Sequence, residues 1–242
     1  MSFMTYARRG IAVVLAFAGT LLASAGPSAG AGLYPTSARG TDISWPQCGS
    51  ALPTVGGFGI VGVTNGRAFS QNPCLAAEYQ WAGSASTSPS LYMNLNAAIG
   101  TTADNGASGP AGNCKRNDLS CWEYNYGWNA AQATFAYALT QGASAAVWWL
   151  DIETANSWRS KTALNRRTIQ GATDALTSRG AQVGIYSAPY AWRTITGSWQ
   201  NGMPVWYAGT AAITCQSASS FTGGTVWLVQ QASASSGGNV GC

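Results

Sequence analysis

The sequence has 242 residues, of which 8% are charged and 46% are hydrophobic. Soluble domains usually carry about 25% charged residues, so this composition excludes a coiled coil, a disordered chain and a charged tail. The net charge of +4 comes from 12 cations and 8 acids that are scattered along the chain, which argues against a nucleic-acid partner. The sequence contains no histidine, which excludes His-dependent nucleophiles and two-His zinc motifs. Acid–base chemistry near neutral pH would therefore fall to carboxylates.

Residues 1–31 have the pattern of a secretory signal peptide. Arg8 and Arg9 precede an apolar stretch at residues 11–22, and small-residue cleavage sites follow at residues 23–25 and 29–31. We therefore expect a secreted, extracellular protein with no membrane insertion once this segment is removed. The Arg-Arg pair is a weak indication of twin-arginine export, and the alternative is an uncleaved membrane anchor, for which the apolar run is short.

Six cysteines remain after residue 31, an even number that favours disulfides in an oxidising compartment. Sequential pairing is preferred among the fifteen possibilities, because it closes a short loop in the middle of the chain and fastens the last residue. A zinc site would need C-x-x-C spacings, which the sequence lacks. The predicted pairs are Cys48 with Cys74, Cys114 with Cys121, and Cys215 with Cys242.

Residues 40–242 contain no linker and no internal repeat, so we expect one domain. Apolar or β-branched runs predict strands at residues 42–45, 58–63, 90–95, 146–152, 182–186, 204–207 and 225–229. Helical patterns fall between them at residues 73–81, 128–141 and 158–179. Alternating strands and helices indicate parallel strands joined by crossovers. The expected fold is an α/β single-domain, slightly irregular TIM-like β/α barrel with parallel strands, and a doubly wound open sheet is the alternative.

The strongest candidate for chemistry is the pair Asp151 and Glu153, at the end of the most apolar strand. Side chains two residues apart share one face of a strand, and burying two acids together is costly, so the pair needs a functional explanation. Mutual repulsion would let one carboxyl keep its proton while the other ionises, the arrangement that glycoside hydrolysis uses. The alternative is a structural ion pair with Arg159 or another arginine. Asp42, which opens the first strand, is a weaker third candidate.

The remaining acids, including Glu78 and Glu123, are expected on the surface. Eleven tryptophans and ten tyrosines form a second pattern, because aromatic faces pack against sugar rings. They favour a polysaccharide ligand, although most such side chains in a protein belong to the core. The G-x-G-x-x-G match at residues 57–62 lies within a predicted strand, so no dinucleotide or other cofactor is expected, and no metal. We expect a monomer. The candidate substrate-binding residues are Trp45, Trp149, Tyr186, Trp206 and Trp227.

The order of several short segments resembles the family 25 glycoside hydrolases, the Chalaropsis-type lysozymes, and in particular their secreted actinobacterial relatives. The matching segments run from residue 41 to residue 231: Thr41-Asp42-Ile43-Ser44-Trp45-Pro46-Gln47, Asn65-Gly66, Ala131-Gln132-Ala133, Leu150-Asp151-Ile152-Glu153, Gly184-Ile185-Tyr186-Ser187, Pro204-Val205-Trp206-Tyr207-Ala208 and Val226-Trp227-Leu228-Val229-Gln230-Gln231. No single segment is specific, but the ordered set is.

The resemblance implies a muramidase that hydrolyses the β-1,4 bond between N-acetylmuramic acid and N-acetylglucosamine in peptidoglycan. By position, Glu153 would be the general acid, Asp151 would stabilise the charged intermediate, and Asp42 would support them. Two departures put this activity in doubt: residues 231–242 lack the aspartate usual after the last strand, and the third strand lacks a histidine often found there. The expected function is thus a secreted, lysozyme-like glycoside hydrolase. The alternatives are a catalytically impaired carbohydrate-binding barrel and a cell-wall interaction protein without a sugar site.

Overall fold

The computed structural model describes residues 1, 33–231 and 237–242, and residues 32–242 form one compact unit. Eight strands close into a barrel in the order β1-β10-β9-β8-β7-β6-β3-β2. Their bounds are β1 Arg39–Ile43, β2 Gly59–Gly62, β3 Ser90–Asn94, β6 Val147–Asp151, β7 Gln182–Ser187, β8 Val205–Gly209, β9 Val226–Gln231 and β10 Gly237–Gly241. Closure of the sheet confirms the predicted barrel and excludes the doubly wound alternative.

The barrel differs from the expected all-parallel arrangement at one strand. β10 runs antiparallel to both β9 and β1, whereas the other neighbouring strands in the barrel pair in parallel. The sequence of β10 is rich in glycine, which is depleted from strands, so composition gave no reason to expect it. Pairing on both sides stabilises it instead, and the barrel therefore closes on a strand that the hydrophobic pattern does not show.

Alternation along the strands separates two hydrophobic clusters. On β6, Trp148 and Leu150 face the helices, and Trp149 lies in a second cluster with Phe58, Ile60, Trp206, Trp227 and Leu228. Side chains two apart share a face of a strand, so Asp151 points the same way as Trp149. Gly184 on β7 permits this packing, because a methyl group there would overlap the Trp149 ring. The lower barrel is thus filled with aromatic side chains beneath the acids.

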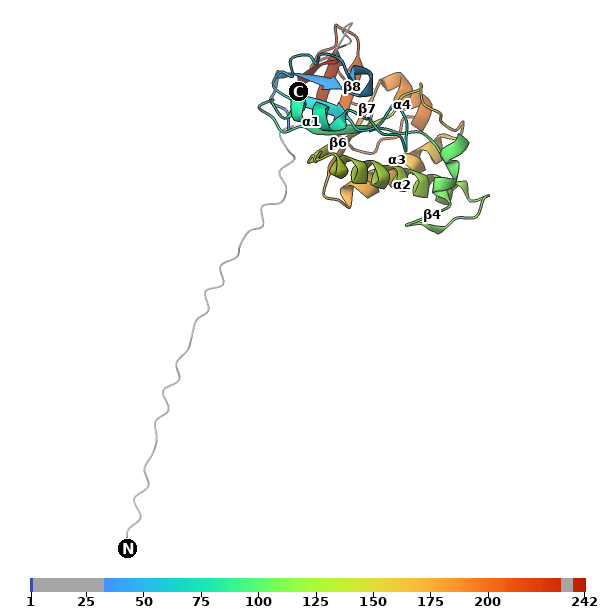
Figure 1. Cartoon of the computed structure of the whole chain (residues 1–242). Helices are drawn as coiled ribbons and strands as arrows, with labels where there is room; N and C mark the ends of the chain where they lie inside the picture. Colours follow the sequence, from blue (N-terminus) through green and yellow to red (C-terminus); the bar gives the residue numbers. More distant parts are fainter. Residues whose placement is uncertain (2–32, 232–236) are drawn as a thin grey trace. The chain divides into compact units, whose positions relative to one another are not determined.

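Four α-helices accompany the strands: α1 Leu75–Ala82, α2 Leu119–Thr140, α3 Thr162–Thr177 and α4 Pro189–Thr196. The first three correspond to the predicted helices, but α2 begins at Leu119 rather than at residue 128, and α4 was not predicted. Asp118 caps α2 by accepting a hydrogen bond from the Cys121 amide, 3.1 Å away. α2 and α3 lie side by side (Figure 1). Short 3-10 helices occupy η1 Trp45–Gln47 and η2 Gly100–Gly106, and β4 Ser108–Gly109 pairs with β5 Gly112–Asn113.

The structure confirms all three predicted disulfides, Cys48–Cys74, Cys114–Cys121 and Cys215–Cys242. The last one fastens the end of β10 to the loop after β8. The predicted signal peptide lies, apart from Met1, outside the described residues. Within the described ranges, no helix is long and apolar enough to cross a membrane.

Candidate functional site

A small pocket of about 130 Å³ lies at the end of the barrel where the parallel strands terminate. Active sites of β/α barrels are found at this end, because the loops that follow the strands converge there. Strands β1, β3, β6, β7, β8 and β9 or the loops after them supply its lining, which consists of Asp42, Tyr92, Asp151, Glu153, Tyr186, Trp206 and Gln230. The structure therefore brings together the three acids that the sequence singled out.

Asp151 ends β6 and is 4% exposed. Its neighbour across the parallel register is Asn94 on β3, whose side-chain amide donates a hydrogen bond to Asp151 Oδ2. Thr64 fixes Asn94 in turn, because the Thr64 hydroxyl donates to Asn94 Oδ1 over 2.8 Å. Among the described residues, Asp151 Oδ1 receives no hydrogen bond from an N–H or hydroxyl donor, and it faces the carboxyl of Glu153 instead.

Glu153 lies just beyond β6, in the loop that begins with Ile152. The Ser187 hydroxyl donates to the Ile152 carbonyl over 2.6 Å, and the Trp158 indole donates to the Glu153 carbonyl over 2.8 Å. These two bonds hold the loop backbone so that the half-buried Glu153 side chain reaches the pocket beside Asp151.

Burial raises the pKa of both acids, and the interaction between them shifts their two pKa values in opposite directions. Burial raises the pKa of Asp151 well above its usual value, and the negative charge of Glu153 and a hydrogen bond to it raise this pKa further. Burial also raises the pKa of Glu153, whereas the hydrogen bond with Asp151 lowers it. The two carboxyls are therefore coupled, and carboxyls of this kind titrate as a unit.

Arg159, the expected partner for a structural ion pair with these acids, binds a different residue. Arg159 binds Glu123 of α2, which is 0% exposed and also accepts hydrogen bonds from Thr168 and from the Ala98 amide. Neither Asp151 nor Glu153 has a guanidinium partner among the described residues. The expectation that Glu123 and Glu78 lie on the surface was wrong, because both are buried, with Glu78 accepting from Asn72 over 2.6 Å.

Asp42 is held by two side-chain amides at its Oδ1 atom. Asn239 of β10 donates over 2.6 Å and Gln230 of β9 donates over 2.9 Å. Burial raises the pKa of Asp42, while these two hydrogen bonds lower it. Trp206 and Tyr186 complete the network, donating to Asn239 Oδ1 over 2.8 Å and to Gln230 Oε1 over 2.7 Å. The amide donors of Gln230 and Asn239 thus fix the orientation of the Asp42 carboxyl.

The aromatic candidates separate into two groups. Tyr186 and Trp206 line the pocket, and Trp45, 43% exposed, lies at the same end of the barrel on η1. Trp149 and Trp227 are 0% and 6% exposed, and their rings pack 6.2 Å apart in the interior cluster. Burial therefore corrects their expected role: these two indoles support the pocket floor and present no face to a ligand.

Tyr92, Asn94, Gln230 and Asn239 were not predicted as site residues. A usable indication existed on β3, where Ser90, Tyr92 and Asn94 alternate with apolar residues and so place three polar groups on one side of a strand. Burial raises the pKa of Tyr92, and the charge of Asp42 raises it further, so its hydroxyl stays protonated. Burial and the charges of Glu153 and Asp151 raise the pKa of Tyr186 in the same way.

The donor set gives no support for a metal. Within residues 33–231 and 237–242, no group of three His, Cys, Asp or Glu side chains is placed to hold an ion. The pocket combines hydroxyl and amide donors with acids whose pKa values are raised by burial. This arrangement suits proton transfer to an uncharged substrate and stabilisation of a developing positive charge.

The geometry defines a carboxylate-centred β/α barrel, and comparisons with known proteins agree with this class. Residues 120–223 match the family model described as Lysozyme-like protein 1. A curated relative, the probable GH family 25 lysozyme 5 of Dictyostelium discoideum, is 41% identical over 64 residues, which cover 25% of this chain and 30% of that protein. The match therefore spans less than a third of the relative.

Solved structures extend the likeness to most of the barrel. A muramidase from Trichobolus zukalii superposes with a TM-score of 0.57 at 16% identity, covering 84% of this chain and 93% of the other. A family GH25 lysozyme from Aspergillus fumigatus gives a TM-score of 0.54 at 14% identity, covering 85% and 94%. At these identities the solved structures show a shared fold, the β/α barrel of lysozyme-type proteins, which agrees with the resemblance found in the ordered segments.

Proposed function

We propose that the protein is an exported muramidase, a glycoside hydrolase that cleaves the β-1,4 glycosidic bond of peptidoglycan. The observation that carries the proposal is the pair Asp151 and Glu153, two coupled acids that line one pocket and have no arginine partner in the described part of the chain, because Arg159 is bound to Glu123. The likeness of the barrel to family 25 lysozymes supports the same activity.

Proton transfer from the pair explains how both roles arise. Glu153 is the more exposed acid and is assigned to the glycosidic oxygen, which it protonates as the bond to the anomeric carbon breaks. The one proton held by the pair passes from Glu153 to the glycosidic oxygen, so both acids become carboxylates and Asp151 lies beneath the developing positive charge. A water molecule then adds to the anomeric carbon and returns a proton to Glu153, so the acid pair ends as it began.

The other pocket residues have supporting roles in this proposal. Asp42 adds a second negative charge, held in place by Gln230 and Asn239. Tyr186 and the exposed Trp45 provide aromatic surface for sugar rings, and the buried Trp206 packs against the Tyr186 ring, 4.5 Å away. The substrate is uncharged at the bond that is cleaved. The protonated hydroxyls of Tyr92 and Tyr186 add no charge to the pocket and can donate hydrogen bonds to such a substrate.

The test compares conservative variants of the acids on purified cell walls. We expect Glu153→Gln to reduce the release of reducing ends by at least about a hundredfold, because a positioned general acid commonly contributes that much. Asp151→Asn should have a comparable effect. Asp174→Asn is a matched control on α3, where the side chain accepts from Tyr124 over 2.8 Å, and should retain activity. Full activity of the folded Glu153→Gln protein would contradict the mechanism.

A specific observation favours a second candidate, a barrel that binds glycan without cleaving it. The end of β9 presents Gln230 to the pocket, and residues 231–242 contain no acid, so the barrel lacks a further carboxylate there. This candidate predicts saccharide binding in calorimetry without any release of reducing ends. Cleavage that depends on Glu153 would exclude it.

Export is part of the proposal. The pattern of residues 1–31 predicts removal of a signal peptide, and three disulfides need an oxidising compartment to persist. Expression of the full sequence in an actinobacterial host should yield a protein in the medium whose first residue lies near position 32. Recovery of the uncut chain from the cells only would contradict this.

A further inference from the structure

A groove of three adjoining hollows lies beside the pocket and is unused by the mechanism above. The largest has a volume of about 640 Å³ and reaches Ile99, which also lines a second hollow of about 350 Å³. Leu119 and Arg159 are shared between the second hollow and a third of about 200 Å³. The three hollows form one path, here named the lateral groove, along the loops that follow β2, β3 and β6.

The lateral groove carries positive charge. Arg67 lines the first hollow, Lys161 the second and Arg116 the third, and all three are exposed. Arg159 does not add to this charge, because it is neutralised by Glu123. Asp104 is the acidic residue among the lining of the three hollows. Three cations against one acid favour an anionic ligand.

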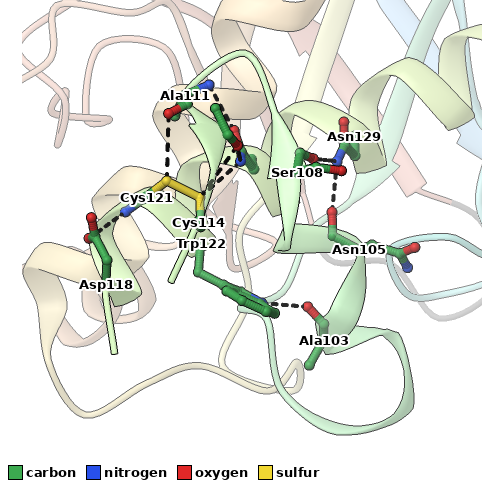
Figure 2. The surroundings of a disulfide bond; sticks show 11 residues. Ala103, Asn105, Ser108, Ala111, Cys114, Asp118, Cys121, Trp122 and Asn129 are labelled. Carbon is green, nitrogen blue, oxygen red and sulfur yellow. Dashed lines mark hydrogen bonds between the residues drawn. A yellow bond between two sulfur atoms is a disulfide. The ribbon is translucent and has the colours of Figure 1, made fainter. Parts of the chain in front are cut away.

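The wall of the groove around Arg116 is held in place. Figure 2 shows the disulfide between Cys114 and Cys121, which closes the short loop that contains Arg116. The same view shows the Trp122 indole donating to the Ala103 carbonyl over 2.7 Å, which fastens η2 to α2. Asn129 adds bonds of 2.7 Å and 2.8 Å to the carbonyls of Asn105 and Ser108 (Figure 2). A fixed wall lowers the entropy cost of binding.

The groove and the pocket are linked through the loop after β6. Glu153 lines the pocket, and Ala155, Asn156 and Ser157, two to four residues further along the same loop, line the first hollow. A substituent on a glycan bound at Glu153 therefore has the first hollow within a few residues of its attachment point. The exposed Thr101 and Ser157 offer hydroxyl groups there, which suits the amide backbone of a peptide.

We propose that the lateral groove binds the acidic peptide branch of peptidoglycan, with Arg67, Arg116 and Lys161 pairing with the carboxylates of the peptide. The inference rests on the proposed function, because it takes the occupant of the groove to be covalently joined to the glycan in the pocket. It assigns recognition of the peptide to residues outside the catalytic pocket.

The test measures binding by calorimetry with the Glu153→Gln protein, so that no ligand is cleaved. The probes are a peptide-free glycan tetrasaccharide, the same glycan carrying tetrapeptides, that glycan with its peptide carboxylates amidated, and the free tetrapeptide. We expect the acidic peptide to tighten glycan binding about tenfold, and the amidated form to lose most of this gain. Replacing Arg116 and Lys161 together by Gln should remove it as well.

The control is Arg39→Gln, which removes one positive charge from an exposed residue at the start of β1, at the opposite end of the barrel, and is compared with Arg116→Gln and Lys161→Gln singly as well as together. The Arg39→Gln variant should keep the tenfold gain. Equal affinity for the glycans with and without peptide would overturn the inference and leave the proposed function standing. Binding of the free peptide that is lost in the Arg116 and Lys161 variant would support the groove even if no glycan bound and no cleavage occurred. Binding of neither the free peptide nor the peptide-bearing glycan would overturn it.

Discussion

The acid–base behaviour of the site depends on single hydrogen bonds to buried carboxyls. Asp151 receives one amide hydrogen bond, from Asn94, and this bond lowers a pKa that burial and Glu153 raise. Asn94 is itself buried and held by Thr64. The charge state of the acid pair is therefore set in part by a residue of β3 that lines none of the pocket.

Replacing Asn94 by Leu should move the alkaline limb of the pH–activity profile to higher pH. Loss of the amide donor destabilises the ionised form of Asp151, so its pKa rises and the shared proton is retained to higher pH. The profile of cell-wall hydrolysis measures this, and the carboxyl ¹³C shift of Asp151 gives the same titration without reliance on activity. Thr64→Val, which removes the hydroxyl that holds Asn94 in place, should move the limb in the same direction by a smaller amount. An alkaline limb that moves to lower pH in the Leu variant would contradict the assignment.

The sequence showed the acids and missed the groups that hold them. Asp151 and Glu153 were recognisable because carboxyls at the end of an apolar strand are costly without a function. Asp42 was a weaker candidate because the sequence placed it at the start of the first strand, whereas it lies near the end of β1. Gln230 and Asn239 contact Asp42 from strands far along the chain. An uncharged amide side chain is common on protein surfaces, so nothing in the sequence distinguishes these two residues from other amides. Trp149 and Trp227 show the opposite error, because an aromatic residue near an acid in the sequence packs equally well beneath it.

At the level of elements, the contact between α2 and α3 fixes the buried ion pair and the start of the loop that carries Glu153. Gly127 of α2 and Gly171 of α3 let the two backbones approach closely: a methyl group at Gly171 would overlap the Tyr124 carbonyl oxygen, and one at Gly127 the Thr168 carbonyl oxygen. Thr168 binds Glu123, which binds Arg159 in turn. Close packing of these helices thus supports the loop after β6.

Gly171→Ala should destabilise the protein, although alanine is the better helix former. The added methyl group meets backbone rather than a flexible side chain, so the helices must separate, at a cost of about 2 kcal/mol and a fall in Tm of about 4–8 °C. Scanning calorimetry measures the change. Gly57→Ala, where an added methyl group makes only ordinary contacts, should alter Tm little. An unchanged or higher Tm for Gly171→Ala would contradict the role of this contact.

Helix α2 and strand β10 show what limited prediction at this scale. The helical pattern became recognisable only near residue 128, because Gly127 and the polar residues before it interrupt the apolar spacing, whereas in the structure they make the contact with α3. β10 contains three glycines and one apolar residue, and its pairing with β1 and β9 depends on residues far apart in the chain. A local sequence pattern identifies an element that buries an apolar face of its own. The first turns of α2 and the whole of β10 are instead stabilised by contacts with a neighbouring element.

Across the whole molecule, most of the acids are buried or line the pocket, whereas the cations among the described residues lie at the surface. Five of the eight acids, Asp42, Glu78, Glu123, Asp151 and Glu153, lie in the pocket or are buried beneath the surface. The small net charge therefore conceals a cationic exterior, which agrees with the positive lateral groove. It also means that protonation of interior acids, rather than pairing at the surface, governs how stability responds to pH.

This sorting predicts that stability falls as pH rises from about 4 to 8, the reverse of ordinary acid denaturation. Burial raises the pKa of Asp42, Glu78, Asp151 and Glu153 above their unfolded values near about 4, so the folded state binds protons more tightly. The resulting stabilisation is complete below the unfolded pKa and is lost as pH rises through the folded one. Calorimetric Tm values between pH 4 and 8 should therefore decline.

Asp151→Asn isolates the largest contribution to this decline. The amide has the shape of the neutral acid, so it still accepts from Asn94 and donates to Glu153 without a charge to bury. We expect its Tm to match the wild type near pH 4 and to exceed it by about 2–4 °C at pH 8, which corresponds to about 1 kcal/mol for a domain of this size. A site built for stability alone would lose Tm on this substitution at every pH. A gain confined to high pH, together with lost hydrolysis, would show that the buried charge is kept for catalysis at the expense of the fold.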